Sequence, residues 1–158
     1  MADLVDSVVT GAQAVAARNQ ITVQVSGGIG VSIWGNPGLL EQALQNLLTN
    51  ACKYSSPGKL VRIDVYADEG RDVSIAVTDQ GFGIEQRHLP RIFERFYRVD
   101  KARSRSQGGT GLGLAIAKHI ALMHHGRLEV QSEVGVGSIF TLIVPRHGQD
   151  QEPAEGPT

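Results

Sequence analysis

The segment from Asn36 to Ser55 constrains the fold more than any other part of this 158-residue chain. Asn36 is suited to cap a helix, and Pro37 suits the first helical position, where its missing N–H costs nothing. The apolar residues that follow recur at helical spacing, which predicts an amphipathic helix over 37–54 with one face on a sheet. These residues are Leu39, Leu40, Ala43, Leu44, Leu47, Leu48 and Ala51.

Two alternating segments after this helix predict a β-hairpin, with strands around 61–65 and 73–77 joined at 68–70. Strands grouped in hairpins between helices predict an α+β fold. We expect a two-layer sandwich with three main helices on one face of a mixed, mostly antiparallel sheet of about five strands. The remaining expected helices cover 4–18, 90–97 and 112–124, and the remaining strands 21–25, 31–34, 127–132 and 138–144.

The length, cysteine count, net charge and apolar runs of the chain exclude several classes of protein. The length fits one domain, expected over 1–146, with a disordered polar tail over 147–158. A single cysteine, Cys52, excludes an internal disulfide and a cysteine-based zinc site. A net charge of -1 argues against a general nucleic-acid-binding surface. No apolar run approaches the roughly 18 residues of a membrane span, so we expect a soluble domain in a reducing compartment.

The face of the 37–54 helix opposite its apolar stripe carries polar side chains three and four residues apart. Side-chain carbonyls on one face, followed by a lysine, suit a hydrated Mg²⁺ and the phosphates that it carries. On spacing alone, a solvated outer surface is the alternative interpretation. The residues are Gln42, Asn46, Thr49, Asn50 and Lys53.

Asp79 ends the second hairpin strand and shares the parity of its apolar residues, so we expect its carboxylate on the buried face. A buried carboxylate needs a partner, and a purine amino group can donate to it. Gly81 and Gly83 would let the backbone approach the ring closely. An Asp-Gly turn that merely closes the strand is the alternative.

The glycine-rich segment 108–114 opens a helix, where backbone N–H groups and the helix dipole favour an anion. It is neither a Walker loop nor a dinucleotide fingerprint, because the required spacings are absent. From Arg87 to Arg105 there are seven Lys or Arg residues against two acids, which favours a local polyphosphate site. None of the histidines has metal spacing or lies beside a nucleophile, so we assign them no catalytic role.

In combination and order, these segments resemble the histidine-kinase branch of the Bergerat-fold ATP-binding superfamily, which also contains gyrase B and MutL. The similarity covers roughly 31–145. Segment 46–55 is similar to the N box, 79–84 to the G1 box, 91–98 to the F box and 109–114 to the G2 box, with an ATP lid over 98–110.

The resemblance implies a role for each matching residue. Asp79 would receive the adenine amino group, with Ser138 supporting it. Asn46 and Asn50 would hold Mg²⁺, and Asn46, Lys53 and Arg98 form the predicted catalytic set. The predicted ATP-binding set is Asn50, Lys53, Tyr54, Asp79, Gly81, Gly83, Ile84, Tyr97, Arg98, Gly109, Thr110, Gly111, Leu112, Gly113, Leu114 and Ser138.

The resemblance also implies a reaction: the γ-phosphoryl of Mg-ATP passes to a histidine on a separate dimerisation domain, then to an aspartate of a response regulator. The acceptor motif is absent and the chain starts at Met-Ala just before the domain, as an expression fragment would, so we expect no autophosphorylation. By the same resemblance, the isolated domain is a cytoplasmic monomer and its parent a homodimer, which can be an inner- or plasma-membrane sensor.

Three rival functions share this fold. Hydrolysing relatives of the gyrase and MutL type carry a glutamate where this chain has Asn46, and an amide cannot take a proton from water. Anti-sigma-factor serine kinases generally lack the aromatic segment 93–97. A degenerate domain that binds no nucleotide would not need Asn50, Asp79 and Gly113.

We also expect loop 99–109 to be mobile without nucleotide and more ordered with it.

Overall fold

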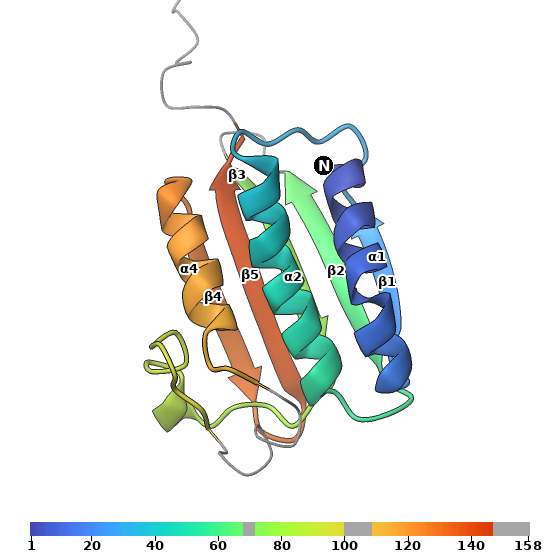
Figure 1. Ribbon diagram of the computed structural model, residues 1–158, viewed down its shortest axis with the longest axis vertical. Helices are drawn as coiled ribbons and strands as arrows, with labels where there is room; N and C mark the ends of the chain where they lie inside the picture. The colour runs from blue at the N-terminus through green and yellow to red at the C-terminus, as the bar shows by residue number, and fades with distance from the viewer. Residues whose placement is uncertain (68–71, 100–108, 147–158) are drawn as a thin grey trace, which may run out of the picture.

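The structure, a computed structural model, describes residues 1–67, 72–99 and 109–146. It confirms the expected fold class: a five-stranded mixed sheet with helices on one face (Figure 1). The helices are α1 (Ala2–Arg18), α2 (Pro37–Tyr54) and α4 (Gly113–Met123), with a 3-10 helix, η1, at Gln86–His88. The strands are β1 (Thr22–Gly27), β2 (Leu60–Ala67), β3 (Asp72–Asp79), β4 (Arg127–Glu133) and β5 (Gly137–Pro145).

The sheet has the strand order β1-β2-β3-β5-β4. Only the β1–β2 pair is parallel among these strands; the other neighbours are antiparallel, and β2 with β3 forms the expected hairpin. A parallel pair needs a crossover connection, and α2 provides it between β1 and β2. This crossover lays α2 across the centre of the sheet, between α1 and α4 (Figure 1).

Helix α2 forms where the sequence predicts it. The Asn36 side chain caps the helix, its Oδ1 accepting from the Leu39 N–H at 3.1 Å, and Pro37 opens the first turn. Its apolar stripe is buried in the core with the inner residues of the sheet. The buried side chains of α2 are Leu40, Ala43, Leu44, Leu47, Leu48, Ala51 and Cys52.

His124 ties the start of α2 to the end of α4. Its ring is buried, Nε2 accepts from the Asn36 N–H at 3.0 Å, and Nδ1 donates to the Ile120 carbonyl at 2.8 Å. Gly35 lies against this ring, and a Cβ added there would be 2.4 Å from the His124 Cδ2. The histidine therefore satisfies backbone groups at two helix ends, a structural role that its sequence position did not reveal.

The expected strand over 31–34 is wrong. Val31 and Ile33 pack partly against the core, but the segment pairs with no strand in the described part of the chain. Three glycines with positive φ, Gly27, Gly28 and Gly30, turn the backbone away from β1 beforehand. The chain then crosses to α2 as an irregular connection.

The expected helix over 90–97 is also wrong. After η1 the backbone continues as successive turns, with the Arg91 and Ile92 N–H groups both donating to the His88 carbonyl. Phe96 has φ of 65° and donates its N–H to the Gly111 carbonyl at 2.8 Å. A long-range hydrogen bond replaces the helical one, so the apolar spacing reflects packing of turns and not of a helix.

No helix within the described ranges is both long and apolar enough to cross a membrane. The expected tail at 147–158 and positions 100–108 of the expected ATP lid lie outside the described residues.

Candidate functional site

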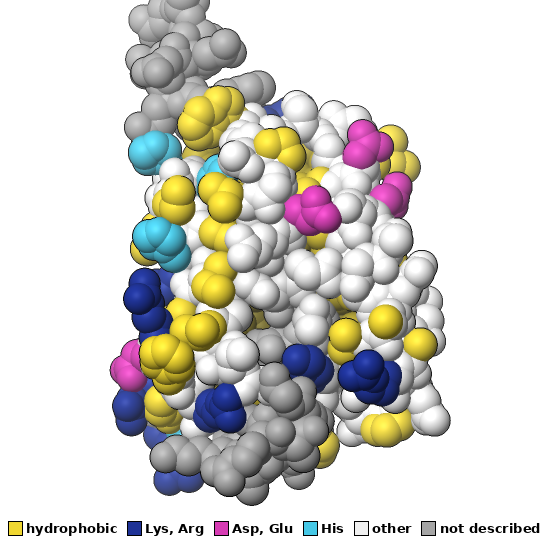
Figure 2. Space-filling view, viewed as in Figure 1, with side chains coloured by type: hydrophobic (Ala, Val, Ile, Leu, Met, Phe, Trp, Pro, Cys, Tyr) yellow, Lys and Arg dark blue, Asp and Glu magenta, His cyan; other side chains and the backbone are white. Residues whose placement is uncertain are grey.

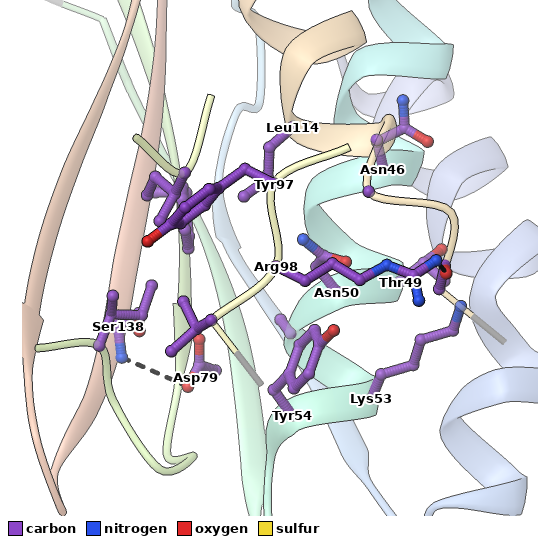
Figure 3. A pocket seen from close by; sticks show the side chains of 18 of the residues that line it. Asn46, Thr49, Asn50, Lys53, Tyr54, Asp79, Tyr97, Arg98, Leu114 and Ser138 are labelled. Carbon is purple, nitrogen blue, oxygen red and sulfur yellow. Dashed lines mark hydrogen bonds between the residues drawn. The ribbon is translucent and has the colours of Figure 1, made fainter. Parts of the chain in front are cut away.

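A cavity of about 340 Å³ lies between α2, the end of β3 and the start of α4 (Figure 3). Its volume is in the range of small-molecule sites. Three segments far apart in sequence meet there, as the motif analysis anticipated. The lining residues are Asn46, Thr49, Asn50, Ala51, Lys53, Tyr54, Asp79, Phe82, Gly83, Ile84, Ile92, Tyr97, Arg98, Val99, Gly109, Thr110, Gly111, Gly113, Leu114, Ser138 and Phe140.

Helix α2 supplies one wall through the polar face identified in the sequence. Asn46, Asn50 and Lys53 all line the cavity, so this face does not simply contact bulk solvent. The Asn46 Nδ2 is buried and has no hydrogen-bond partner among the described residues. A buried donor of this kind is suited to an oxygen-rich ligand, because leaving it unpaired is costly.

Asp79 occupies the opposite end of the cavity. The residue is 7% exposed, which confirms the expected orientation toward the buried face. Oδ1 accepts from the Gly81 N–H at 2.8 Å and from the Ser138 N–H at 3.3 Å, and the second of these contacts is drawn in Figure 3. Burial raises the pKa of this carboxyl above its ordinary value, and the two backbone hydrogen bonds counteract part of that rise.

The Ser138 side chain has a different partner from Asp79. Its Oγ lies 2.8 Å from the Ser132 Oγ, which also accepts from the Ile84 N–H at 2.8 Å. Ser138 therefore contacts Asp79 through its backbone, and its hydroxyl helps fix the segment around Ile84.

Two predicted site residues do not line the cavity. Gly81 pairs with Ser55 in an isolated antiparallel bridge, and a Cβ there would lie 2.3 Å from the Tyr54 carbonyl oxygen. Its lack of a side chain serves this backbone junction. Leu112 is likewise absent from the lining, and its N–H donates to the Thr110 Oγ1 at 3.3 Å.

Gly83 does line the cavity, and the structure explains the glycine. Its φ is 70°, and a Cβ would lie 2.0 Å from the Glu133 carbonyl oxygen. A side chain at this position would push the loop off the β4–β5 turn.

The remaining wall joins the 97–99 segment to the start of α4. Gly111 has φ of 72° and lies against the Phe96 backbone, so the two segments approach closely. The Arg98 guanidinium donates to the Gly109 carbonyl. This contact places a cation beside the glycine-rich turn that leads into α4.

Charge is distributed unevenly along the cavity. Arg98 and Lys53 lie on the side of Asn50 and Thr49, whereas Asp79 and Ser138 lie on the other (Figure 3). On the helix-covered face, most Lys and Arg side chains gather at this end of the molecule (Figure 2). The cavity therefore suits a ligand with an anionic group at one end and a hydrogen-bond donor at the other.

The predicted ATP-binding set left out six lining residues: Thr49, Ala51, Phe82, Ile92, Val99 and Phe140. Two had a usable signal. Phe140 has the parity of Ser138 along β5, and Thr49 belongs to the polar face of α2. Val99 was expected only as part of the ATP lid, and Ile92 had no signal, because the turns that place it were expected to be a helix.

The donor set around Asn46 is compatible with Mg²⁺. The described residues contain no group of three or more His, Cys, Asp or Glu side chains that could hold a metal. Amide oxygens are hard ligands, and Mg²⁺ commonly keeps several waters while phosphates complete its shell. The buried, unpartnered Nδ2 of Asn46 fits beside such phosphates or waters.

Comparison with known proteins identifies related sequences. Residues 35–148 match a family model described as Histidine kinase-, DNA gyrase B-, and HSP90-like ATPase. The chain is 48% identical over 147 residues to the sensor-like histidine kinase SenX3 of Mycolicibacterium smegmatis, covering 90% of this chain and 38% of that protein. It is 42% identical over 138 residues to the phosphate regulon sensor protein PhoR of Pseudomonas aeruginosa, covering 87% and 31% respectively.

Solved structures of histidine kinases are also similar to this chain. The mycobacterial sensor histidine kinase MprB matches with a TM-score of 0.73 and 30% identity, covering 89% of this chain and 93% of that one. Full-length ShkA in complex with AMPPNP matches with a TM-score of 0.77 and 28% identity, covering 90% and 29%. The chain thus spans well under half the length of the curated relatives described above.

Proposed function

The chain belongs to the family of histidine kinase-, DNA gyrase B- and HSP90-like ATPases, and we propose that it is the catalytic half of a sensor histidine kinase. It would bind Mg-ATP and transfer the γ-phosphoryl group to a histidine on a separate dimerisation and phosphoacceptor domain. That group would then pass to a response regulator.

One observation carries the choice of kinase over hydrolase: Asp79 is the sole carboxylate among the described residues that line the cavity. Its Oδ1 is engaged by two backbone N–H groups at the end opposite the cations. Asn46 stands where hydrolysing relatives have a glutamate, and it offers no base to activate water. Attack by an external histidine nitrogen needs no such base on this chain.

The chain's own groups would position the nucleotide and stabilise its charge, which is the main task of a protein in phosphoryl transfer. Asp79 would accept from the adenine amino group, and the Lys53 and Arg98 cations would face the phosphates. Asn46 and Asn50 would hold Mg²⁺, which supplies charge neutralisation at the phosphate oxygens when bound. Lys53, Arg98 and Asn46 are therefore the residues that we propose act on the transferred group.

The limits of the domain, its cellular location and its other partners are also proposals. We propose a catalytic domain over 1–146, an ATP lid over 98–110, and a cytoplasmic location in a parent that dimerises and can be membrane-anchored. ADP would be the second nucleotide ligand, and nucleic acid is not an expected partner.

The test mixes this chain with γ-³²P-ATP, Mg²⁺ and the isolated dimerisation domain of its parent protein. We expect acid-labile, base-stable label on the acceptor, and none when the acceptor histidine is replaced by alanine. Saturable ATP hydrolysis that is lost in Asn46→Ala, without label on the acceptor, would instead identify an ATPase.

A further inference from the structure

Tyr97 is held on two sides by residues that the proposed function does not use. Its hydroxyl lies 2.5 Å from the His88 Nδ1, and the two rings are 6.0 Å apart between centroids. The Arg91 guanidinium carbon lies 4.4 Å from the Tyr97 ring centroid. Arg91 is itself held by Glu94, with Nη2 and Oε2 3.2 Å apart.

These contacts fix the orientation of a cavity wall. Tyr97 lines the cavity, and its hydroxyl points away from Arg98 and Lys53 (Figure 3). A ring anchored at its hydroxyl and covered by a guanidinium on one face has little freedom to rotate. The next residue is Arg98, whose guanidinium donates to the Gly109 carbonyl, so the same anchor also helps to fix the backbone from which this cation extends.

From this geometry we infer that His88 is a positioning residue: through Nδ1 it holds the Tyr97 ring in the orientation that the nucleotide meets. The inference rests on the proposed nucleotide binding. His88 and Tyr97 are both half-buried, and a hydrogen bond between such groups adds little to folding stability. Its main effect is to order the ring before the ligand arrives, which lowers the entropic cost of binding.

The hydrogen bond does not depend on one protonation state of the imidazole. A tyrosine hydroxyl donates to a neutral Nδ1 and accepts from an Nδ1–H. An asparagine side chain can place a nitrogen or oxygen near the position of Nδ1, and it also donates and accepts. His88→Asn should therefore conserve the anchor, whereas His88→Phe keeps a ring and removes it.

The experiment measures Mg-ATP binding to the full 158-residue chain by isothermal calorimetry. Ordering one side chain on binding corresponds to a loss of about twofold to tenfold in affinity, which we expect for His88→Phe and for Tyr97→Phe. Both variants remove the same contact. The double variant should therefore bind Mg-ATP with an affinity no lower than that of the single variant that binds more weakly. His88→Asn should bind within about twofold of wild type.

Arg127→Gln is the control, since Arg127 is an exposed basic residue of β4 whose ion pairs are with Asp72 and Glu129. It should leave the affinity unchanged. An unchanged affinity in His88→Phe, losses that add in the double variant, or a His88→Asn as weak as His88→Phe would each overturn the inference. Wild-type protein that binds no nucleotide would remove the proposed function as well.

A second measurement covers the case in which His88→Phe does not fold. The ¹⁵N chemical shift of the His88 Nδ1 should change between wild type and Tyr97→Phe, because the hydroxyl that it contacts is lost. An unchanged shift would overturn the inference without reference to nucleotide binding.

Discussion

Replacing Asp79 by asparagine should separate nucleotide binding from folding stability. The asparagine Oδ1 can still accept from the Gly81 and Ser138 N–H groups, which donate to the aspartate Oδ1 in the wild type. Its NH₂ group must then face the cavity, where the proposed ligand offers the adenine amino group. A donor would meet a donor, and a charged acceptor would be lost, at a cost of about 2–4 kcal/mol. That cost corresponds to an affinity about 30-fold to 1,000-fold weaker.

Stability should respond differently. Exchanging a charged acceptor for a neutral one weakens each of the two backbone hydrogen bonds by about 1 kcal/mol. Removing the buried charge offsets this loss, because the raised pKa of Asp79 shows that burial disfavours the ionised form more than those bonds favour it. We therefore expect the unfolding free energy at pH 7 to stay within about 1 kcal/mol of wild type, or to increase.

The pH dependence has a definite sign. The folded protein binds the Asp79 proton more tightly than the unfolded chain does, so protonation stabilises the fold. The contribution of this carboxyl to stability should fall as pH rises from its ordinary pKa of 3.8 through the raised value. Mg-ATP affinity should change in the opposite direction, because the ionised carboxylate is the better acceptor.

Calorimetric titration with Mg-ATP and urea unfolding followed by circular dichroism measure the two quantities. Asp72→Asn is the matched control: it removes a carboxylate from the other end of β3, where Asp72 lies 3.7 Å from the Arg127 guanidinium. If Asp79→Asn binds Mg-ATP with an affinity within threefold of wild type, the adenine amino group does not lie at the Asp79 end of the cavity and that assignment is refuted. A loss of several kcal/mol of stability would refute the reasoning on its charge.

Three further predictions concern single side chains. Asn46→Ala should weaken Mg²⁺-dependent ATP binding about tenfold in calorimetry, since it removes a buried amide and its oxygen ligand, while phosphate release by the wild type stays near background. His124→Phe should lower the unfolding free energy by about 1–3 kcal/mol in urea titrations, because the Asn36 N–H loses its acceptor on the buried imidazole; an unchanged midpoint would contradict this. Burial raises the pKa of the Cys52 thiol to about 11, so a thiol reagent at pH 8 should label it only after denaturation, and rapid labelling of native protein would show that the site opens.

The sequence predicted those elements whose periodicity matches their environment. Helix α2 and the β2–β3 hairpin are amphipathic in the way that their burial requires, and the parity of β3 was enough to place Asp79 inside. The parallel pairing of β1 could not be read from its residues, because it depends on the crossover through α2. The turns at 90–97 could not be predicted either, since the Phe96 N–H finds its partner at Gly111, far along the chain.

The site shows the same division. The spacing of polar residues predicted the polar face of α2. Gly81 was assigned to ligand binding, although its missing side chain allows a close backbone contact with Tyr54. A glycine needed by a neighbouring backbone and a glycine needed by a ligand look alike in sequence. Only the packing around each one separates the two cases.

The backbone bridge between Ser55 and Gly81 has a consequence for inhibitor design. It joins the end of α2 directly to the segment after β3, so we expect the buried corner around Asp79 to keep its shape when a ligand enters. Tyr97 and Arg98 themselves are held through side-chain contacts at half-buried positions, beside the backbone hydrogen bond from Phe96 to Gly111. Fragment screening should therefore give its first hits at the Asp79 corner, and growing a fragment toward Arg98 should add enthalpy at an entropic cost.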